Sequence, residues 1–485
     1  MASELHNWTR EAERVIEAKN LLYFRQGVGL KYDKRKLSRL EAQTVSHSKE
    51  FVSLFGKKPE TLFLISALEI GYASTLKLYL KLDETRMSKI VSNEHKVNGA
   101  PVNWGSWRQF AASTDDSMAR KKVFDTFLRK TSLLAPIVKA RFDGIARAMS
   151  GLGTDPLSNY LSLERIKYET LANLVDNLGR VLKPQFRESL ARYSREILGR
   201  DAEYFDDFYF FRARVFRKYQ KAPPTRVDPI SQIVRTMEGM GLDARRVKVD
   251  SANRKAKSPS AFCAFIKIPS DVRISYRKSN PLEDLTGVFH EFGHGIHASS
   301  IDPSTSFGDK HGIPMGIAEI FSTFFEILMH DENYLKFKLG VPDAVSRDLA
   351  NRFRFTNLFF VTFYAANSTM KLRYWHDQLS ISEASRMYAD MTEKYMGIRY
   401  PGEYWLLHHV MPDSALYSPS YVLAAVRAFE LKSAITSRFG ERFWEDKGSG
   451  KFLLELMAPG RGIRLEKFSK LDTGPFVSSL KAAAS

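Results

Sequence analysis

The pentapeptide His290-Glu291-Phe292-Gly293-His294 constrains the fold of this 485-residue chain more than any other feature. If both histidines are to bind one ion, they must lie on an α-helix, where side chains four residues apart stand one turn above each other on the same face. Two imidazoles placed in this way can reach one Zn²⁺ ion at about 2.0–2.1 Å. Glu291 then lies beside the open coordination position, where it can take a proton from the metal-bound water.

The flanking residues predict such a helix independently. Asn280 and Pro281 are typical of an N-cap and a first helical position, and Glu283 completes a capping box. Gly293 and Gly295 are poor helix formers, so we interpret them as positions where another backbone or the metal site packs closely. An apolar surface at helical spacing is formed by Leu285, Val288, Phe289 and Phe292. The alternative is a buried amphipathic helix with two incidental histidines.

Glu319 is the best candidate for a third metal ligand, because catalytic zinc sites usually have three protein ligands. It follows His294 by 25 residues, enough for a loop and a second helix alongside the first. Glu319 and Glu326 are the only charged side chains in the otherwise apolar stretch from Ile317 to Met329. A buried carboxylate needs a partner, and a metal is one. Glu326 lies on the same helix face, where it can accept the remaining N–H of a ligating histidine. The alternative for Glu319 is a salt-bridged helix residue.

These residues resemble the thimet oligopeptidase and oligoendopeptidase F family of zinc peptidases. The likeness covers roughly residues 105–480 and is strongest at 258–330, which includes the His290–His294 motif, the 25-residue gap and the segment 319–326. Segments 258–263, 285–290 and 452–457 also agree with that family. The resemblance implies a mainly α fold, a two-lobed helical bowl with a deep substrate cleft and a small β-sheet next to the motif helix. It also implies that His290, His294 and Glu319 bind one Zn²⁺ per chain and that Glu291 is the general base.

A second resemblance, to the carboxypeptidase Taq family, leaves the type of cleavage open. Segment 271–275, Asp-Val-Arg-Ile-Ser, resembles that family's Asp-x-Arg-x-Thr signature, and 417–421 resembles its Tyr-Phe-Pro-Thr-Tyr. Ser275 replaces the family's threonine and Ala318 replaces its histidine, whereas the glycine-rich turn of the thimet type is Pro-Asp-Ser at 412–414. Under this resemblance Arg273 binds the free C-terminus of a peptide. The alternative is an arginine on a strand edge, paired with Asp271 or Glu283.

A group of histidines and tyrosines near position 410 is suited to stabilising the oxyanion formed during peptide hydrolysis. Both related families place a histidine and a tyrosine in this region as donors to the substrate. We expect His409, Tyr417 and Tyr421 in catalytic roles and His408 in substrate binding, although the two adjacent histidines leave the register open. Pro419 is expected to begin a helix with Ser418 as its N-cap. Alternatively, the two tyrosines are packing residues.

The composition fits a large soluble enzyme. No 18-residue uncharged apolar run occurs, the N-terminus lacks a secretory apolar region, and a single cysteine, Cys263, suits a reducing compartment. We therefore expect a cytoplasmic protein with no membrane partner and a buried Cys263. The net charge is +18. Basic residues are densest at 245–257, a segment that contains no aromatic residue, and the next aromatic residue is Phe262. We interpret it as a solvated β-hairpin that attracts peptide carboxylates, and expect no nucleic-acid binding.

The chain is expected to be a single metallopeptidase unit, 1–485, with a helical lobe at 1–240 and a catalytic lobe at 241–485. Strands are expected at 246–250 and 262–277, where an edge strand can pair with an extended substrate. Weak boundaries occur at 98–105 and 222–225. His297 and His311 are not expected to bind the metal. Helical periodicity occurs at 35–54, 60–81, 117–149, 159–198, 345–375, 381–396 and 421–439.

The sequence therefore predicts a zinc-dependent metallopeptidase that hydrolyses short peptides. A metallocarboxypeptidase that releases C-terminal residues is the first alternative. A non-catalytic peptide-binding protein on a peptidase scaffold is the second, although zinc binding alone would not need Glu291.

Overall fold

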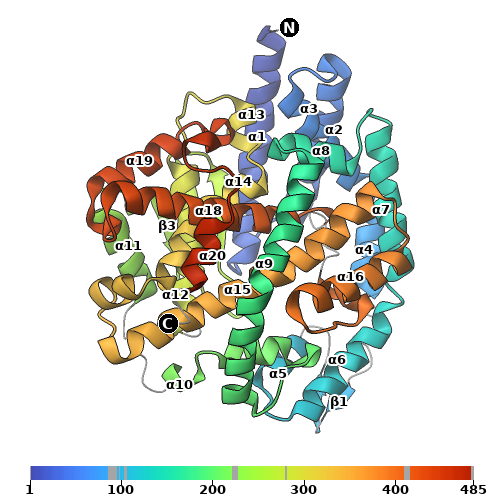
Figure 1. Ribbon diagram of the computed structural model, residues 1–485. Coiled ribbons are helices and arrows are strands. Elements are labelled where there is room, and N and C mark those ends of the chain that lie inside the picture. The colour runs from blue at the N-terminus through green and yellow to red at the C-terminus, as the bar shows by residue number, and fades with distance from the viewer. Residues whose placement is uncertain are drawn as a thin grey trace. The chain divides into compact units, whose positions relative to one another are not determined.

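The computed structural model describes residues 2–85, 95–97, 99–102, 106–220, 228–278, 281–408 and 415–481. Helices account for most of these residues, and the strands form two small sheets (Figure 1). The expectation of a mainly α fold is therefore confirmed. By its internal packing the chain divides into two compact units. Unit 1 contains residues 1–70, 222–350 and 423–476, and unit 2 contains residues 71–221, 351–422 and 477–485.

This grouping differs from the contiguous lobes expected at 1–240 and 241–485. Residues 1–70 belong to unit 1 because helix α1 (Ala2–Gly27) packs against strand β4 (Phe262–Lys267), far along the chain. One division of the units falls between residues 221 and 222, next to the weak boundary expected at 222–225. The segment 222–225 itself lies outside the described residues.

The sheet of unit 1 has three strands in the order β3-β5-β4. Strand β3 (Val247–Asp250) pairs in parallel with β5 (Asp271–Ser275), and β4 pairs with β5 in the antiparallel sense. The strands expected at 246–250 and 262–277 are thus found, with the second stretch folded into a hairpin. Because β5 is the central strand, Arg273 does not lie on a sheet edge, contrary to one of the two interpretations of that residue.

Two helices of unit 1 carry the predicted motif residues. Helix α12 (Pro281–Ser299) begins at the predicted proline and contains both motif histidines, and helix α14 (Met315–Glu326) contains Glu319. Asn280, the expected N-cap, lies outside the described residues. Besides α1, α12 and α14, the α-helices that lie wholly in unit 1 among the described residues are α2 (Lys34–Phe55), α11 (Pro229–Gly239), α13 (Phe307–His311) and α19 (Lys447–Met457).

The basic segment 245–257 is not the predicted solvated hairpin. Strand β3 pairs with β5 rather than with the residues that follow it, and Lys257 is only 3% exposed. The Lys257 ammonium donates to the backbone oxygens of Asp250 and Tyr276 at 2.6 and 2.8 Å and to the Asp250 carboxylate at 2.8 Å. Arg254 forms a two-bond pair with the same carboxylate. These two cations therefore hold the connection between β3 and β4.

Unit 2 is built mainly from helices, several of which are shorter than the sequence pattern indicated. The periodic stretches at 117–149 and 159–198 each contain a turn, near residues 132–134 and 165–167, that divides them into two helices. Strands β1 (His95–Val97) and β2 (Ala100–Val102) pair in the antiparallel sense at the start of the weak boundary expected at 98–105, of which residues 98 and 103–105 lie outside the described residues. The helices of unit 2 include α4 (Leu76–Thr85), α5 (Trp107–Ser113), α6 (Ser117–Thr131), α7 (Ala135–Ser150), α8 (Pro156–Glu164), α9 (Tyr168–Leu198), α10 (Arg217–Gln220), α16 (Ile381–Met396) and α17 (Trp405–His408).

The divisions between the units fall inside four helices. These are α3 (Glu60–Ala73), α15 (Asp343–His376), α18 (Ser418–Phe439) and α20 (Gly474–Lys481). Among the described residues, no single helix is long and apolar enough to cross a membrane. The bent pair α3 and α4 passes the same test of length and composition when its two helices are taken together.

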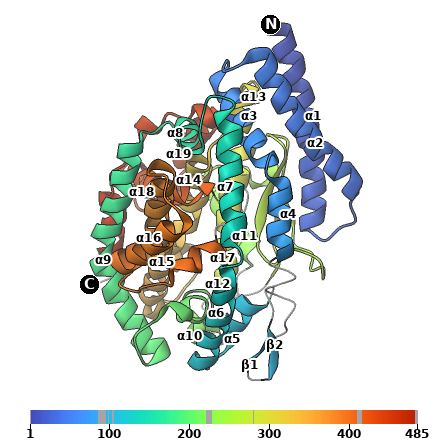
Figure 2. The same cartoon turned by 90° about the vertical axis from the view of Figure 1, so that its right-hand side faces the viewer.

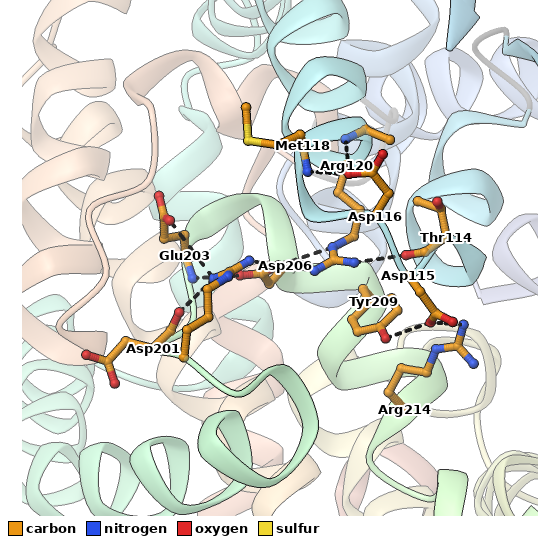
Figure 3. A network of polar contacts seen from close by, with 12 residues as sticks. Thr114, Asp115, Asp116, Met118, Arg120, Asp201, Glu203, Asp206, Tyr209 and Arg214 are labelled. Carbon is orange, nitrogen blue, oxygen red and sulfur yellow. Dashed lines mark hydrogen bonds and ion pairs between the residues drawn. The ribbon is translucent and has the colours of Figure 1, made fainter. Parts of the chain in front are cut away.

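A buried ion-pair network joins α6 of unit 2 to the segment after α9. The Asp206 carboxylate accepts hydrogen bonds from Arg120 at 2.8 and 3.2 Å, from Arg200 at 2.7 and 2.8 Å, and from the backbone N–H of Glu203 at 2.9 Å. Figure 3 shows Arg120 between this carboxylate and the Tyr209 ring, whose centroid lies 3.9 Å from the guanidinium carbon. Two arginines thus hold the buried carboxylate of Asp206 in place.

Candidate metal centre

Helices α12 and α14 pack closely because glycines on α12 leave room for neighbouring atoms. A Cβ atom on Gly293 would lie 2.5 Å from the Phe321 carbonyl oxygen and 2.5 Å from the Ser322 Cα. A Cβ atom on Gly295 would lie 2.9 Å from the Val247 side chain of β3. The structure therefore agrees with the interpretation of both glycines as sites of close packing. One glycine faces the second helix and the other faces the sheet.

This packing brings two histidines and a glutamate together. The Glu319 Oε2 atom lies 3.2 Å from His290 Nε2 and 3.4 Å from His294 Nε2. One ligand atom from each of these three residues lies within 4.8 Å of the other two. In a tetrahedral site with bonds of about 2.0–2.1 Å, neighbouring ligand atoms are about 3.3–3.4 Å apart. The separations to Glu319 match this value.

The electrostatics of these residues favour a positive charge between them. Burial lowers the pKa of His290, but hydrogen bonds to the Glu319 and Glu326 carboxylates outweigh it and raise that pKa well above its usual value. Burial raises the pKa of Glu319, but the neighbouring His294 and His290 outweigh it and hold that pKa well below its usual value. A metal cation binds such a site by displacing protons from its ligands.

A second layer of contacts orients the candidate ligands. The Glu326 Oε2 atom lies 2.8 Å from His290 Nδ1, on the side of the ring opposite Glu319. This is the contact that the seven-residue spacing of the two glutamates predicted. The hydroxyl of Ser322 donates to Glu319 Oε2 at 2.9 Å. Sequence analysis missed Ser322, although its position three residues after Glu319 on a helix is a signal for such a contact.

Glu291, the predicted base, lies directly after His290 on α12 and is partly exposed. It also lies near the thiol of Cys263 on β4, since burial and the Glu291 carboxylate together raise the pKa of that thiol well above its usual value. The expected burial of Cys263 is therefore only partly met, because the residue as a whole retains some exposed surface. Strand β4 thus passes close to the candidate base.

Neither His297 nor His311 belongs to the group of candidate ligands found among the described residues. His297 is buried against the Phe321 ring at 4.6 Å, and burial lowers its pKa to about 3. The Phe321 contact therefore accounts for its burial without a metal. His311 lies at the end of α13 and contacts Glu13 of α1 at 3.3 Å.

Arg273 forms two hydrogen bonds with the Asp271 carboxylate of the same strand, at 2.9 and 2.7 Å. Its guanidinium carbon lies 5.3 Å from the centre of the Phe24 ring on α1. Lys248 of β3 also contacts Asp271, at 3.0 Å. One of the two structural partners anticipated for Arg273 is therefore present. The arginine is 29% exposed, so it retains accessible surface.

The predicted oxyanion donors belong to unit 2. Tyr421 lies in the first turn of α18, with its ring 4.8 Å from that of Tyr417 and stacked on that of Tyr364 at 4.7 Å. The helix begins at Ser418, whose buried hydroxyl forms no hydrogen bond in the described part of the chain, so the predicted side-chain cap is absent. His408 is the last residue of α17, whereas His409 lies outside the described residues.

Comparison with known proteins was made by sequence and by structure. Neither protein-family models nor curated protein sequences give a match. Comparison with solved structures, in contrast, gives matches over nearly the whole chain. A PZ peptidase A bound to an inhibitor has a TM-score of 0.65 and 15% identity, with 100% of this chain and 96% of that chain covered. A Bacillus anthracis protein described as an oligoendopeptidase F has a TM-score of 0.63 and 15% identity, with 95% and 87% covered.

A carboxypeptidase structure is similar to the same extent. The M32 carboxypeptidase of Deinococcus radiodurans R1 has a TM-score of 0.62 and 13% identity, and the match covers 100% of both chains. The chain has the fold of these peptidases. This peptidase fold agrees with both resemblances seen in the sequence. The matches extend over 87–100% of the three solved chains rather than over the metal centre alone.

Proposed function

We propose that the chain is a zinc-dependent peptidase of short peptides. The single observation that carries the proposal is the group formed by His290, His294 and Glu319, with Glu291 beside it on α12. Two imidazoles and one carboxylate are the donor set of many catalytic zinc sites. The similarity of fold to peptidases supports the same conclusion.

The chemistry divides between the metal and the chain. When bound, zinc supplies a Lewis acid that polarises a carbonyl and lowers the pKa of a water toward about 7. Glu291 takes the proton of the attacking water and passes it to the leaving amine. Glu326 holds the His290 ring through Nδ1, and Ser322 holds the Glu319 carboxylate.

The proposal also assigns catalytic and substrate-binding roles to residues of unit 2. We assign Tyr421, Tyr417 and His409 as donors to the developing oxyanion and His408 to substrate binding. Hydroxyl and imidazole donors that are fixed in advance stabilise such a charge by several kcal/mol. The packing of Tyr421 between Tyr417 and Tyr364 supports this role by fixing its ring.

The general-base role is tested by two substitutions with opposite predictions. Glu291→Gln should retain about one zinc ion per chain while kcat falls by roughly 10²–10⁴, the usual contribution of an acid–base group. Glu319→Gln should instead lose the metal. Metal content by elemental analysis and hydrolysis of a fluorogenic peptide measure the two effects. Turnover close to that of the unmodified protein in both variants would refute the proposal.

A carboxypeptidase is the second candidate, favoured by Arg273 and by the similarity to the M32 carboxypeptidase. If Arg273 receives a free C-terminus, Arg273→Ala should raise KM for free-acid peptides by roughly 10–100-fold and leave amidated peptides unaffected. Product masses from a free-acid peptide and its amidated twin provide the measurement. Equal effects on both peptides would mean that Arg273 only stabilises β5 through Asp271.

A further inference from the structure

Strand β4 is an edge of its sheet, and the direction of its outward backbone groups can be assigned. Its single strand neighbour among the described residues is β5. The Tyr276 N–H donates to the Asp250 carbonyl, so the even-numbered residues at this end of β5 point toward β3. Arg273 and Ser275 then point toward β4, where their partners are Ala264 and Phe262. The alternate residues of β4, Cys263 and Phe265, therefore direct their N–H and C=O groups away from the sheet.

The outward groups of Cys263 lie beside the candidate catalytic base. Cys263 is opposite Ile274 in the sheet register, and Ile274 approaches the Gly295 position of α12 at 3.4 Å. Successive side chains of a strand point to opposite faces, so Cys263 shares the face that packs on α12. The electrostatic effect of Glu291 on the Cys263 thiol agrees with this placement. A peptide paired with Cys263 would therefore pass beside Glu291.

Helix α1 covers the opposite face of β4 and reaches its edge. The Phe24 and Phe262 rings lie 6.2 Å apart, and the Glu17 carboxylate pairs with Lys267 at 3.1 Å. Between these two contacts the Asn20 side-chain amide donates to the Phe265 carbonyl at 2.7 Å. This carbonyl is one of the outward groups of the edge, so a side chain of α1 already occupies it.

We propose that Asn20 closes the β4 edge and limits the length of peptide that can pair with it. The inference rests on the proposed peptidase function and names which peptides the site takes. A peptide antiparallel to β4 places the residue opposite Phe265 two positions before the residue opposite Cys263. Because Asn20 holds the Phe265 carbonyl, backbone pairing ends there. The site therefore favours substrates with a short segment on the N-terminal side of the cleaved bond.

A set of peptides with one cleavage sequence tests the limit. The set is extended by one to three residues at the N-terminus or, separately, at the C-terminus. Asn20→Ala frees one main-chain acceptor, so kcat/KM for the longest N-terminal extension should rise by about 2- to 10-fold, the value of one hydrogen bond. Values for C-terminal extensions should not change. If the alanine variant folds poorly, Asn20→Ser can replace it. Its side chain is also shorter, so the same rise in kcat/KM for N-terminal extensions is expected.

Glu17→Gln is the matched control, because it loosens α1 from Lys267 without freeing a strand carbonyl. Its length profile should match that of the unmodified protein. An unchanged profile in the Asn20 variants, or a gain on C-terminal extension, would overturn the proposal. Affinities of the same peptides for zinc-loaded Glu291→Gln, with and without Asn20→Ala, should show the same selective gain. Hydrolysis of the shortest peptide by the unmodified protein tests the peptidase function separately.

Discussion

Two carboxylates of this protein are almost equally buried but are held by different kinds of partner. Glu319 of unit 1 is 3% exposed, and the Asp206 side chain of unit 2 is 1% exposed. The partners described for Asp206 are two arginines and a backbone N–H, which carry permanent charge or a fixed dipole. Those described for Glu319 are two imidazoles and a hydroxyl.

The difference shows how burial alone fails to separate a structural carboxylate from a metal ligand. A guanidinium never loses its charge in a protein, so the Asp206 network is complete without any added ion. An imidazole binds a metal in its neutral form, and its lone pair is then directed at the same point as the carboxylate. Convergence of two imidazole nitrogens, which can release their protons to a metal, on one carboxylate oxygen is therefore the informative feature of the Glu319 group.

The largest predicted effect is on the stability of metal-free protein. Asp206→Asn leaves the buried Arg120 without its full counter-charge, so the free energy of unfolding should fall by about 3–5 kcal/mol. Glu319→Gln should lower it by clearly less. Denaturation by urea in the presence of a chelator measures both. An equal loss in the two variants would mean that Glu319 is an ordinary structural ion pair.

The second prediction concerns stabilisation by zinc, which should depend on Glu319 and not on Asp206. Zinc at about 1,000 times its Kd should stabilise the unmodified protein by about 4 kcal/mol, through binding to the folded state alone. Asp206→Asn should retain this gain, whereas Glu319→Gln should lose most of it. Thermal unfolding with and without zinc provides the measurement. A zinc effect that survives Glu319→Gln would place the ion elsewhere.

Glu326 is predicted to affect the metal more weakly than Glu319. Its contact with His290 Nδ1 orients the imidazole and increases its basicity, so Glu326→Gln should lower zinc affinity by about 10–100-fold. Competition with a chromophoric chelator measures the change. Arg200→Lys, in the Asp206 network, is the control and should leave zinc affinity unchanged.

The smallest prediction concerns a carboxylate of intermediate burial. Glu13 of α1 contacts His311 and Lys310, and these contacts, the His311 hydrogen bond foremost, lower its pKa from 4.5 to about 2. Because the folded-state pKa is depressed, this stability is present above pH 4.5 and is lost as the pH falls toward 2. Glu13→Gln should remove that part of the acid sensitivity. Parallel slopes of stability against pH for both proteins would contradict the assignment.

Much of the metal centre could be predicted from the sequence because its geometry is local. The spacing of His290 and His294 fixes their relation on one helix, and the spacing of Glu319 and Glu326 does the same on another. Gly293 and Gly295 indicate close packing on α12 from the sequence alone, whereas the atoms that pack against them are distant in sequence and are seen only in the structure. Local periodicity was also sufficient to locate α2, α15, α16 and α18.

Other features could not be predicted because they depend on partners distant in sequence. Helix α1 was not among the helices expected, since its buried residues are divided between two partners. Val15 and Leu22 pack against α2, whereas Phe24, together with Val28 directly after the helix, packs against Ile266 of β4. No single apolar stripe results. The discontinuous composition of the two units has the same cause, because a pattern along the chain does not say which segments meet.

The position of α1 on β4 also sets the order of events during synthesis. Asn20 and its partner Phe265 are separated by 245 residues, so α1 leaves the ribosome long before the strand it covers. At about 5–20 residues per second the wait is roughly 12–50 s. During that time Phe24 and Val28 have no strand to pack against, although α2 is already available to the other face of the helix. Helices α1 and α2 therefore have time to pack on each other before α1 can pack on β4.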